Sequence, residues 1–256
     1  MQYAIVTGDS RGLGEAIAEQ FLGKSIHVIG VSRHSNKELS KLAEKYDGNY
    51  THVGCDLSDP SQLEKGIEQV VKQVTHNDTH FIYLVNNAGV IEPIETVGNF
   101  HLQDVSKHMM INVTAPMMFV NHLLKEANDH SITTAIINIT SGAAERSVHG
   151  WSVYSSSKAA INRFTETTAL EQEMADKEHK IIAYSPGVVD TDMQKEIRSS
   201  KESAFADLDK FKALKEEGQL NSPKTVAAVL MDLLNDYSSI ESGKVYKLYD
   251  LIESKA

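Results

Sequence analysis

A glycine-rich turn between a strand-like run and a helix-like run constrains the fold of this chain most strongly. Residues 3–6 form a short apolar run, which is typical of a buried strand. Residues 7–14 read TGDSRGLG, and Leu13, Ile17 and Phe21 then recur at helical spacing. Glycine permits a tight turn, and the free N–H groups at the start of a helix can hold a phosphate. The turn therefore predicts a dinucleotide-binding loop, with a glycine turn that binds no ligand as the alternative.

Strand-like and helix-like runs alternate along nearly the whole chain after this turn. We expect further strands at 26–31, 50–55, 81–85, 134–139, 181–184 and 244–248, and helices at 36–46, 60–74, 102–128, 152–175 and 223–234. This alternation predicts an α/β fold with a doubly wound parallel sheet of about seven strands flanked by helices. Five prolines and no break in composition predict a single domain over residues 1–256.

Composition and charge limit the possible functions. The net charge of −10 and the pI of about 5.5 argue against a general nucleic-acid or membrane-surface role. No apolar run approaches the length of a membrane span, and no leader-like stretch begins the sequence, so we expect a cytoplasmic protein. The single cysteine, Cys55, excludes an intrachain disulfide, and no cluster of His, Cys and Asp has the spacing of metal ligands.

Basic residues near the turn suggest which dinucleotide would bind. The second predicted strand ends in Ser32 and Arg33, where folds that prefer NAD usually carry an acidic residue. Arg33, together with Arg11 in the turn, could hold the 2′-phosphate of NADP, although each could be an ordinary surface arginine. We therefore predict NADP(H) as the cofactor. Asp9 adds a negative charge that weakens phosphate binding unless its carboxylate points away.

Polar and small residues follow several predicted strands. Residues 86–89 read NNAG after the fourth strand, and residues 185–193 read SPGVVDTDM after the sixth. Ligands of open parallel sheets bind at the carboxyl ends of the strands, although NNAG also fits a plain turn. Asn112 lies in an apolar helical run, where a buried amide needs hydrogen-bond partners.

Tyr154 and Lys158 are four residues apart in a predicted helix, which places them on one face. A positive charge about 4 Å from a phenol lowers its pKa by about three units before burial opposes it. Such a tyrosine could exchange a proton with a substrate oxygen near neutral pH. The alternative is a half-buried tyrosine and a solvated lysine on a surface helix. Trp151 either lines a substrate pocket or packs under this helix.

A charged segment follows the sixth predicted strand. Between residues 194 and 220, Phe205, Leu208, Phe211 and Leu214 recur every third residue, which predicts one apolar helical stripe. This helix could cover the core, or it could form a mobile substrate lid at about 190–220.

Together, TGDSRGLG, Asp56, NNAG, Asn112, Ser141, Tyr154, Lys158 and Pro186-Gly187 resemble the pattern of the short-chain dehydrogenase/reductase family, in order and over nearly the whole chain. The resemblance implies a Rossmann-type domain and a dimer or tetramer. It implies that Ser141 orients a substrate carbonyl, Tyr154 donates a proton to it, Lys158 lowers the tyrosine pKa and binds the nicotinamide ribose, and Asn112 holds a water. The cofactor contacts expected from the loops and from the resemblance are Val6, Gly8, Ser10, Arg11, Gly12, Leu13, Gly14, Ser32, Arg33, Asp56, Leu57, Asn86, Asn87, Ala88, Gly89, Tyr154, Lys158, Pro186, Gly187, Val188, Val189 and Thr191.

The carboxyl-terminal part is similar to the benzil-reductase group of this family, which belongs with sepiapterin-reductase-like members. Residues 186–198, 207–220 and 222–227 carry this similarity. It implies NADPH-dependent reduction of one carbonyl of an aromatic 1,2-diketone, of the benzil to (S)-benzoin type. Trp151, His149 and Met193 would then contribute to an apolar substrate pocket. The alternatives are a sepiapterin or other ketone reductase of the same fold, and a non-catalytic NADP-binding regulator.

Overall fold

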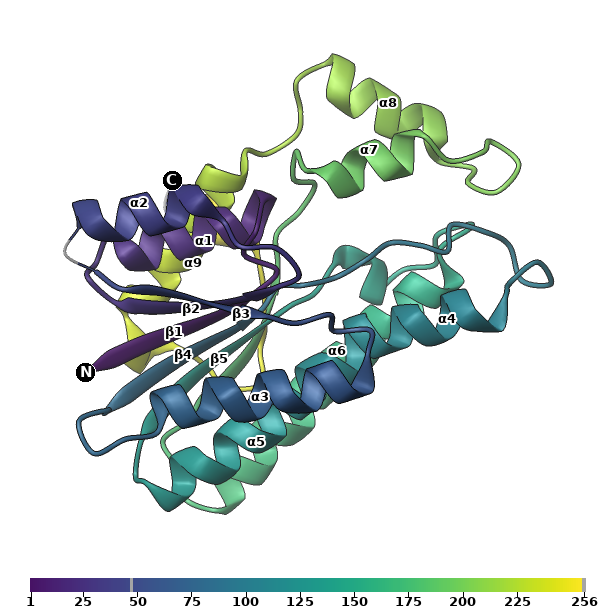
Figure 1. Ribbon diagram of the computed structural model, residues 1–256. Helices are drawn as coiled ribbons and strands as arrows, with labels where there is room; N and C mark the ends of the chain where they lie inside the picture. The colour runs from purple at the N-terminus through teal and green to yellow at the C-terminus, as the bar shows by residue number, and fades with distance from the viewer. Residues whose placement is uncertain (47, 255–256) are drawn as a thin grey trace.

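An open sheet of seven parallel strands forms the centre of the computed structural model, which describes residues 1–46 and 48–254 (Figure 1). The strand order is β3-β2-β1-β4-β5-β6-β7, so the direction of winding reverses between β1 and β4. The strands are β1 (Gln2–Thr7), β2 (His27–Ser32), β3 (Tyr50–Gly54), β4 (Phe81–Asn86), β5 (Thr133–Ile139), β6 (Lys180–Ser185) and β7 (Val245–Lys247). The predicted doubly wound α/β fold is confirmed.

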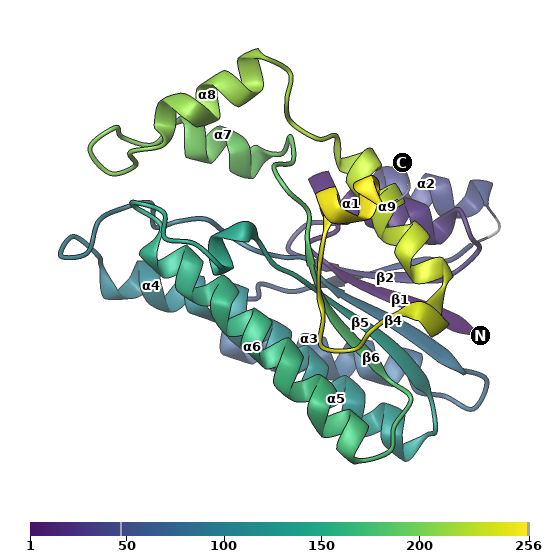
Figure 2. The same cartoon turned by 180° about the vertical axis from the view of Figure 1, so that it is seen from behind.

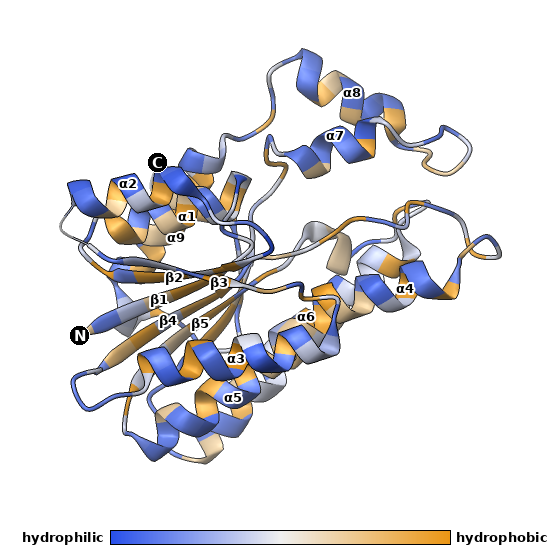
Figure 3. Cartoon of the chain, viewed as in Figure 1, coloured by the Kyte–Doolittle hydropathy of each residue, from blue (hydrophilic) through white to orange (hydrophobic). Residues whose placement is uncertain are grey.

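Helices cover both faces of the sheet (Figures 1 and 2). One face carries α1 (Gly12–Leu22), α2 (Lys37–Lys45) and α9 (Pro223–Asn235); the other carries α3 (Pro60–Val74), α5 (Ala115–Asp129) and α6 (Ser152–Met174). The side chains of Asn36, Asp59 and Ser222 accept hydrogen bonds from first-turn amides, which explains where three of these helices begin. Figure 3 shows apolar strands between helices whose outward faces are hydrophilic, as burial of apolar surface requires.

The helical stretch predicted at 102–128 is observed, but it is not uniform. It consists of α4 (Leu102–Met109), a π-helical turn (Met110–Thr114) and α5. Pro116 lies in the first turn of α5, where its missing N–H is tolerated. The π turn widens the helix at Asn112 and Val113, which are both buried.

Two short helices, α7 (Asp192–Arg198) and α8 (Leu208–Glu216), stand apart from the sheet beyond the carboxyl ends of its strands (Figures 1 and 2). The prediction of one helical stripe through Phe205 is wrong. The amides of Ala204 and Phe205 both donate to Lys201 O, so the chain turns between α7 and α8 and Phe205 lies outside both helices.

The remaining elements are short. A 3-10 turn (Gly142–Ala144) follows β5, another (Tyr237–Ser239) precedes β7, and α10 (Leu248–Glu253) follows β7. Over residues 1–46 and 48–254, no helix is both long and apolar enough to cross a membrane.

Candidate active site

The glycine turn forms a tight cradle at the point where the sheet reverses its winding. Gly8 has a φ of +71°, and a Cβ there would lie 2.9 Å from the Cα of Ala88. A Cβ on Gly14 would lie 2.3 Å from Gly8 O. Helix α1 begins at Gly12 and Arg11 makes no side-chain cap, so no side chain occupies the first-turn amides. These residues fit the pyrophosphate of a dinucleotide.

The carboxylate of Asp9 points to β2 and β3 and is fully buried. The hydroxyl of Tyr50 donates to Asp9 Oδ2 at 2.5 Å, and a Cβ on Gly30 would lie only 1.9 Å from the same oxygen. Gly30 therefore makes room for this carboxylate beneath the turn. The Asp9 carboxylate thus points away from the glycine turn, which is the condition under which it does not weaken phosphate binding.

The NNAG segment braces the glycine turn from the neighbouring strand. Asn87 Nδ2 donates to Thr7 O at 3.0 Å and to Gly8 O at 3.3 Å. The hydroxyl of Thr7 accepts from the amides of Asn87 at 3.0 Å and Ala88 at 3.1 Å. The Asn87 side chain therefore holds the glycine turn in place, and the expected cofactor contacts of residues 86–89 stay a prediction.

A buried chain of amides links the next two strands to α6. Asn86 Nδ2 donates to Asn138 Oδ1 at 2.9 Å, and Asn138 Nδ2 donates to Thr165 Oγ1 at 2.9 Å. Neither Asn138 nor Thr165 was expected at the site. The sequence feature that could have indicated them is Asn138 itself, because a polar side chain inside the apolar run of residues 135–139 requires a buried partner.

Cationic side chains surround the expected adenosine end of the site. Arg33 is exposed immediately after β2. Hydrogen bonds from Ser58 hold the pKa of Asp56 below its ordinary value, and the charges of Arg33 and Lys107 lower it further. Both cations thus lie within electrostatic range of Asp56. Lys107 was missed, because a lysine on an exposed helix face carries no distinguishing sequence signal.

The loop from β6 to α7 runs against the glycine turn. A Cβ on Gly12 would lie 3.3 Å from Thr191 Cγ2, and Arg11 Nη1 lies 3.3 Å from Asp192 Oδ2. Arg11 therefore pairs with α7 in this structure, so its expected contact with a 2′-phosphate stays a prediction. The other expected cofactor residues differ in exposure. Gly187 is exposed, and Ser10, Gly89 and Val188 are partly exposed. The buried ones are Val6, Leu13, Ser32, Leu57, Pro186 and Val189.

Tyr154 and Lys158 lie on one buried face of α6, as expected. Burial raises the pKa of Tyr154, and a hydrogen bond with Ser141 opposes this increase. Lys158 Nζ donates to Ile139 O at 2.8 Å and lies 5.8 Å from the centroid of the Tyr154 ring. Burial lowers the pKa of Lys158 to about 8. Burial of the phenol is therefore the larger effect on the Tyr154 pKa in this arrangement, and the expected lowering of that pKa by Lys158 stays a prediction.

Asn112 lies beside this pair, and its side chain is used by protein partners. Its Oδ1 accepts from Val90 N at 2.9 Å, and its Nδ2 donates to Val90 O at 2.8 Å and to His108 Nε2 at 2.9 Å. A Cβ on Gly89 would lie 3.4 Å from Asn112 Oδ1 and 3.7 Å from Lys158 Nζ. The Asn112 amide therefore fixes the loop after β4 close to Lys158, and its role in holding a water stays a prediction.

An aromatic cluster covers Tyr154. Trp151 stacks on Phe205 with ring centroids 5.0 Å apart, and it meets Phe211 and Tyr154 edge-on at 5.4 and 5.5 Å. Only 4% of Trp151 is exposed. Trp151 therefore connects the start of α6 with residues 201–216, the segment that comprises the turn after α7 and helix α8.

The other two expected substrate residues lie around the same contact. Met193 packs against this apolar cluster. His149 is exposed, and its Nδ1 accepts a hydrogen bond from Ala206 N at 3.3 Å. His149 therefore helps to hold the 201–216 segment in place.

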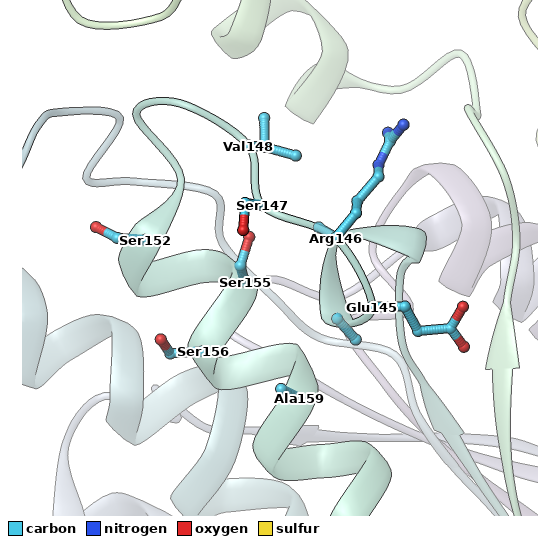
Figure 4. A pocket seen from close by; sticks show the side chains of 10 residues that line it. Glu145, Arg146, Ser147, Val148, Ser152, Ser155, Ser156 and Ala159 are labelled. Carbon is cyan, nitrogen blue, oxygen red and sulfur yellow. The ribbon is translucent and has the colours of Figure 1, made fainter.

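A surface hollow of about 480 Å³ lies beside α6 (Figure 4). Residues 143–148 line it together with Ser152, Ser155, Ser156 and Ala159 of α6. Because Tyr154 and Lys158 face the opposite side of the same helix, this hollow is not the place where they would meet a substrate.

We expect Gly150→Ala to loosen the 201–216 segment. Gly150 has a φ of +81°, and a Cβ there would lie 2.0 Å from Ala204 O. The left-handed backbone alone costs about 1–2 kcal/mol for alanine, enough to raise a local opening equilibrium about 5- to 30-fold. Tryptic cleavage of the folded protein after Lys201, followed by mass spectrometry, should accelerate accordingly.

Gly98→Ala is the matched control for this variant, because Gly98 also has a positive φ but no atom within 4 Å of its Cβ position. Equal cleavage rates after Lys201 in the Gly150→Ala variant and the unmodified protein would show that Gly150 does not anchor the segment.

Comparison with known proteins agrees with this geometry. A family model described as short chain dehydrogenase matches residues 2–202. The benzil reductase ((S)-benzoin forming) of Bacillus cereus is 39% identical over 248 residues, covering 97% of this chain and 99% of the relative. A short chain dehydrogenase/reductase structure from Saccharomyces cerevisiae is 32% identical with a TM-score of 0.79, covering 96% of both chains. The structure of ElxO with NADP bound is 27% identical with a TM-score of 0.77 over 96% of both chains. The chain belongs to the short-chain dehydrogenase/reductase family of oxidoreductases.

Proposed function

We propose that this protein is an NADPH-dependent carbonyl reductase that reduces one carbonyl of an aromatic 1,2-diketone. The observation that carries the proposal is the burial of Tyr154 beneath an aromatic cluster, with Ser141 near enough to lower the pKa of its hydroxyl. Such a site offers a proton donor to a carbonyl oxygen and an apolar environment to aryl groups. The similarity to a benzil reductase over 97% of the chain supports the same substrate class.

The residues of the site divide the chemistry of a carbonyl reduction among them. A bound nicotinamide cofactor supplies the hydride that reaches the carbonyl carbon. The hydroxyls of Ser141 and Tyr154 donate hydrogen bonds to the carbonyl oxygen, where negative charge grows, and Tyr154 transfers its proton to that oxygen. A raised pKa keeps this proton on Tyr154 at neutral pH. Lys158 carries a positive charge below about pH 8 and can stabilise the tyrosinate that forms.

The residues that would hold the cofactor form two groups. The glycine cradle and the start of α1 suit the pyrophosphate, and Lys158 would contact the nicotinamide ribose. Arg33 and Lys107 near Asp56 suit a phosphate on the adenosine ribose, and no carboxylate ends β2. These features favour NADPH over NADH.

We expect Arg33→Ala to weaken NADPH binding selectively. A charge-assisted hydrogen bond to phosphate contributes about 1.5–3 kcal/mol, which corresponds to a loss of affinity of roughly 10- to 100-fold. NADH affinity should change little, because NADH lacks that phosphate. Titration of both cofactors by fluorescence measures the two effects, with Arg163→Ala as a control, since Arg163 pairs with Glu166 on the exposed side of α6. An equal loss for both cofactors would remove the argument for NADPH.

The segment containing α7 and α8 would act as the substrate lid. Phe205 and Phe211 pack directly on Trp151, and Trp151 contacts Tyr154. A substrate that reaches the Tyr154 hydroxyl must therefore displace part of this aromatic packing. Aromatic pairs contribute about 0.5–1.5 kcal/mol each, so aryl groups of a substrate could replace the contacts that opening removes.

NADPH oxidation with benzil, 1-phenyl-1,2-propanedione and sepiapterin, measured side by side, tests the proposal. We expect the highest kcat/KM for benzil and an optically active benzoin as product. A preference for sepiapterin would favour a pteridine ketone reductase of the same fold. NADPH binding without turnover of any of the three would contradict the proposal and favour a regulator that senses the cofactor.

A further inference from the structure

His108 is a fully buried histidine that packs against Tyr154 and Ser157 of α6. It lies on α4, one helical turn before Asn112, and 0% of its surface is exposed. Its ring meets the ring of Tyr154 edge-on at a centroid distance of 6.1 Å. A buried titratable side chain in contact with a proton donor is a candidate for a functional role.

The hydrogen bonds of His108 join three elements of the site. Its Nδ1 lies 2.6 Å from Glu92 O, in the loop after β4. Its Nε2 lies 2.9 Å from Asn112 Nδ2 and 2.9 Å from Ser157 Oγ, on α6. The Ser157 hydroxyl in turn lies 2.8 Å from Tyr154 O, to which it can donate.

These contacts determine the tautomer. A backbone carbonyl only accepts, so Nδ1 must carry a hydrogen and donate it to Glu92 O. Asn112 Nδ2 only donates, and Asn112 cannot be reversed without losing both bonds to Val90. Nε2 must therefore accept from Asn112, which requires a neutral imidazole.

Protonation would rearrange the same network. A hydrogen on Nε2 would face the Asn112 Nδ2 donor, while Ser157 Oγ could still accept it. Because the Ser157 hydroxyl donates its own hydrogen to Tyr154 O, addition of one proton would thus replace the bond between His108 and Asn112 with a bond from His108 to Ser157 Oγ. The two protonation states therefore differ in whether Asn112 is bonded to His108 in addition to Val90.

We propose that His108 is a positioning residue that, when neutral, holds the Asn112 side chain in place for proton transfer by Tyr154, and that protonation of His108 breaks this bond and transfers the contact to Ser157 on α6. The effect on turnover rests on the proposed reductase function; the coupling between His108 and Asn112 does not.

The charges around His108 set the pH range of the effect. Burial lowers the pKa of His108, and the positive charge of Lys158 lowers it further, while the bond to Glu92 O opposes both. The Tyr154 ring that faces it is uncharged at neutral pH because the pKa of Tyr154 is raised. A lowered histidine pKa means that the neutral form persists below the ordinary value of about 6.5, so the bond between His108 and Asn112 is present at neutral pH and is lost in more acidic solution.

The coupling itself can be tested without turnover. Nitrogen-15 NMR of the imidazole should report the Nδ1–H tautomer at pH 7.5. The side-chain amide signals of Asn112 should shift as the pH falls, with the same midpoint as the His108 ring and below about 6.5. A His108 tautomer with hydrogen on Nε2, or Asn112 signals that do not follow the His108 titration, would overturn the proposal.

The consequence for catalysis is tested by two substitutions. His108→Gln places one donor and one acceptor at the end of the side chain and cannot be protonated in this range. We expect it to retain kcat for NADPH-dependent reduction at pH 7.5 within about threefold and to lose the acidic decline of kcat. His108→Leu should lower kcat about 10- to 100-fold with NADPH affinity nearly unchanged, as expected for misplaced catalytic groups.

His101→Gln is the matched control, because His101 is exposed at the start of the same helix and its side chain makes no capping hydrogen bond. An acidic decline that persists unchanged in His108→Gln would overturn the role in catalysis. Failure of the unmodified protein to reduce any carbonyl would contradict the proposed function, while the NMR titration would still decide whether His108 holds Asn112.

Discussion

Tyr154→Phe is expected to lower kcat for carbonyl reduction about 10²- to 10⁴-fold, the usual contribution of a positioned general acid. The substitution removes one oxygen from a side chain that is 93% buried and leaves the ring contacts with Trp151 and His108 in place. NADPH affinity should therefore change by less than about twofold. Steady-state kinetics and a fluorescence titration of NADPH separate the two effects.

Tyr83→Phe provides the matched control, because Tyr83 is a half-buried tyrosine of β4 whose ring packs on Phe21 and Phe81. It should leave kcat unchanged. If Tyr154→Phe retained more than about a tenth of kcat, the proton donor would have to be another group.

Lys158→Met is expected to abolish most activity and to stabilise the fold. Burial lowers the pKa of Lys158 to about 8, so holding its charge at pH 7 costs roughly 3 kcal/mol of folding free energy relative to the unfolded chain. Methionine removes that cost and fills much of the volume, although Ile139 O loses a donor. We expect a higher free energy of unfolding, kcat reduced about 10²-fold or more, and weaker NADPH binding.

The stability gained in Lys158→Met should decrease as the pH rises. Lys158 is charged below about pH 8 and neutral above it. The stability that Lys158→Met adds should be greatest below pH 8 and disappear as the pH rises toward the unfolded lysine value of about 10.4. Urea unfolding at pH 7 and pH 9.5, with exposed Lys65→Met as control, measures it. Equal or lower stability of Lys158→Met at pH 7 would show that the buried ammonium is not a cost to the fold.

The sequence was sufficient to predict the architecture, because each strand and each sheet-covering helix carries its own local pattern. Pro60, Asn36 and the glycine turn mark helix starts directly in the chain, and the structure places α3, α2 and α1 at those positions. Tyr154 and Lys158 were found for the same reason, since a spacing of four residues on a helix fixes a shared face. The shared geometry of Ser141 and Tyr154 depends on two neighbouring elements, the 3-10 turn that Ser141 precedes and α6, which pack against each other.

Features that depend on burial and on distant segments were harder to predict from the sequence. Burial in an apolar cluster that includes Trp151 and Phe205 raises the pKa of Tyr154, and no spacing in the sequence gives the extent of that burial. Phe205 appeared to belong to a helical stripe, but its contact with Trp151 requires a turn. His108 was missed because two of its partners, at 92 and 157, are 16 and 49 residues away along the chain, and its spacing of four from Asn112 does not by itself indicate burial.

Transfer of deuterium from NADPH labelled with two deuterium atoms at C4 of the nicotinamide to benzil tests the central claim most directly. The unmodified protein and Tyr154→Phe would be incubated with the labelled cofactor, and the product would be analysed by mass spectrometry and chiral chromatography. The account predicts benzoin with one deuterium on the carbinol carbon, formed predominantly as one enantiomer, and almost no product from Tyr154→Phe. Benzoin without deuterium, racemic benzoin, or equal product from both proteins would contradict it.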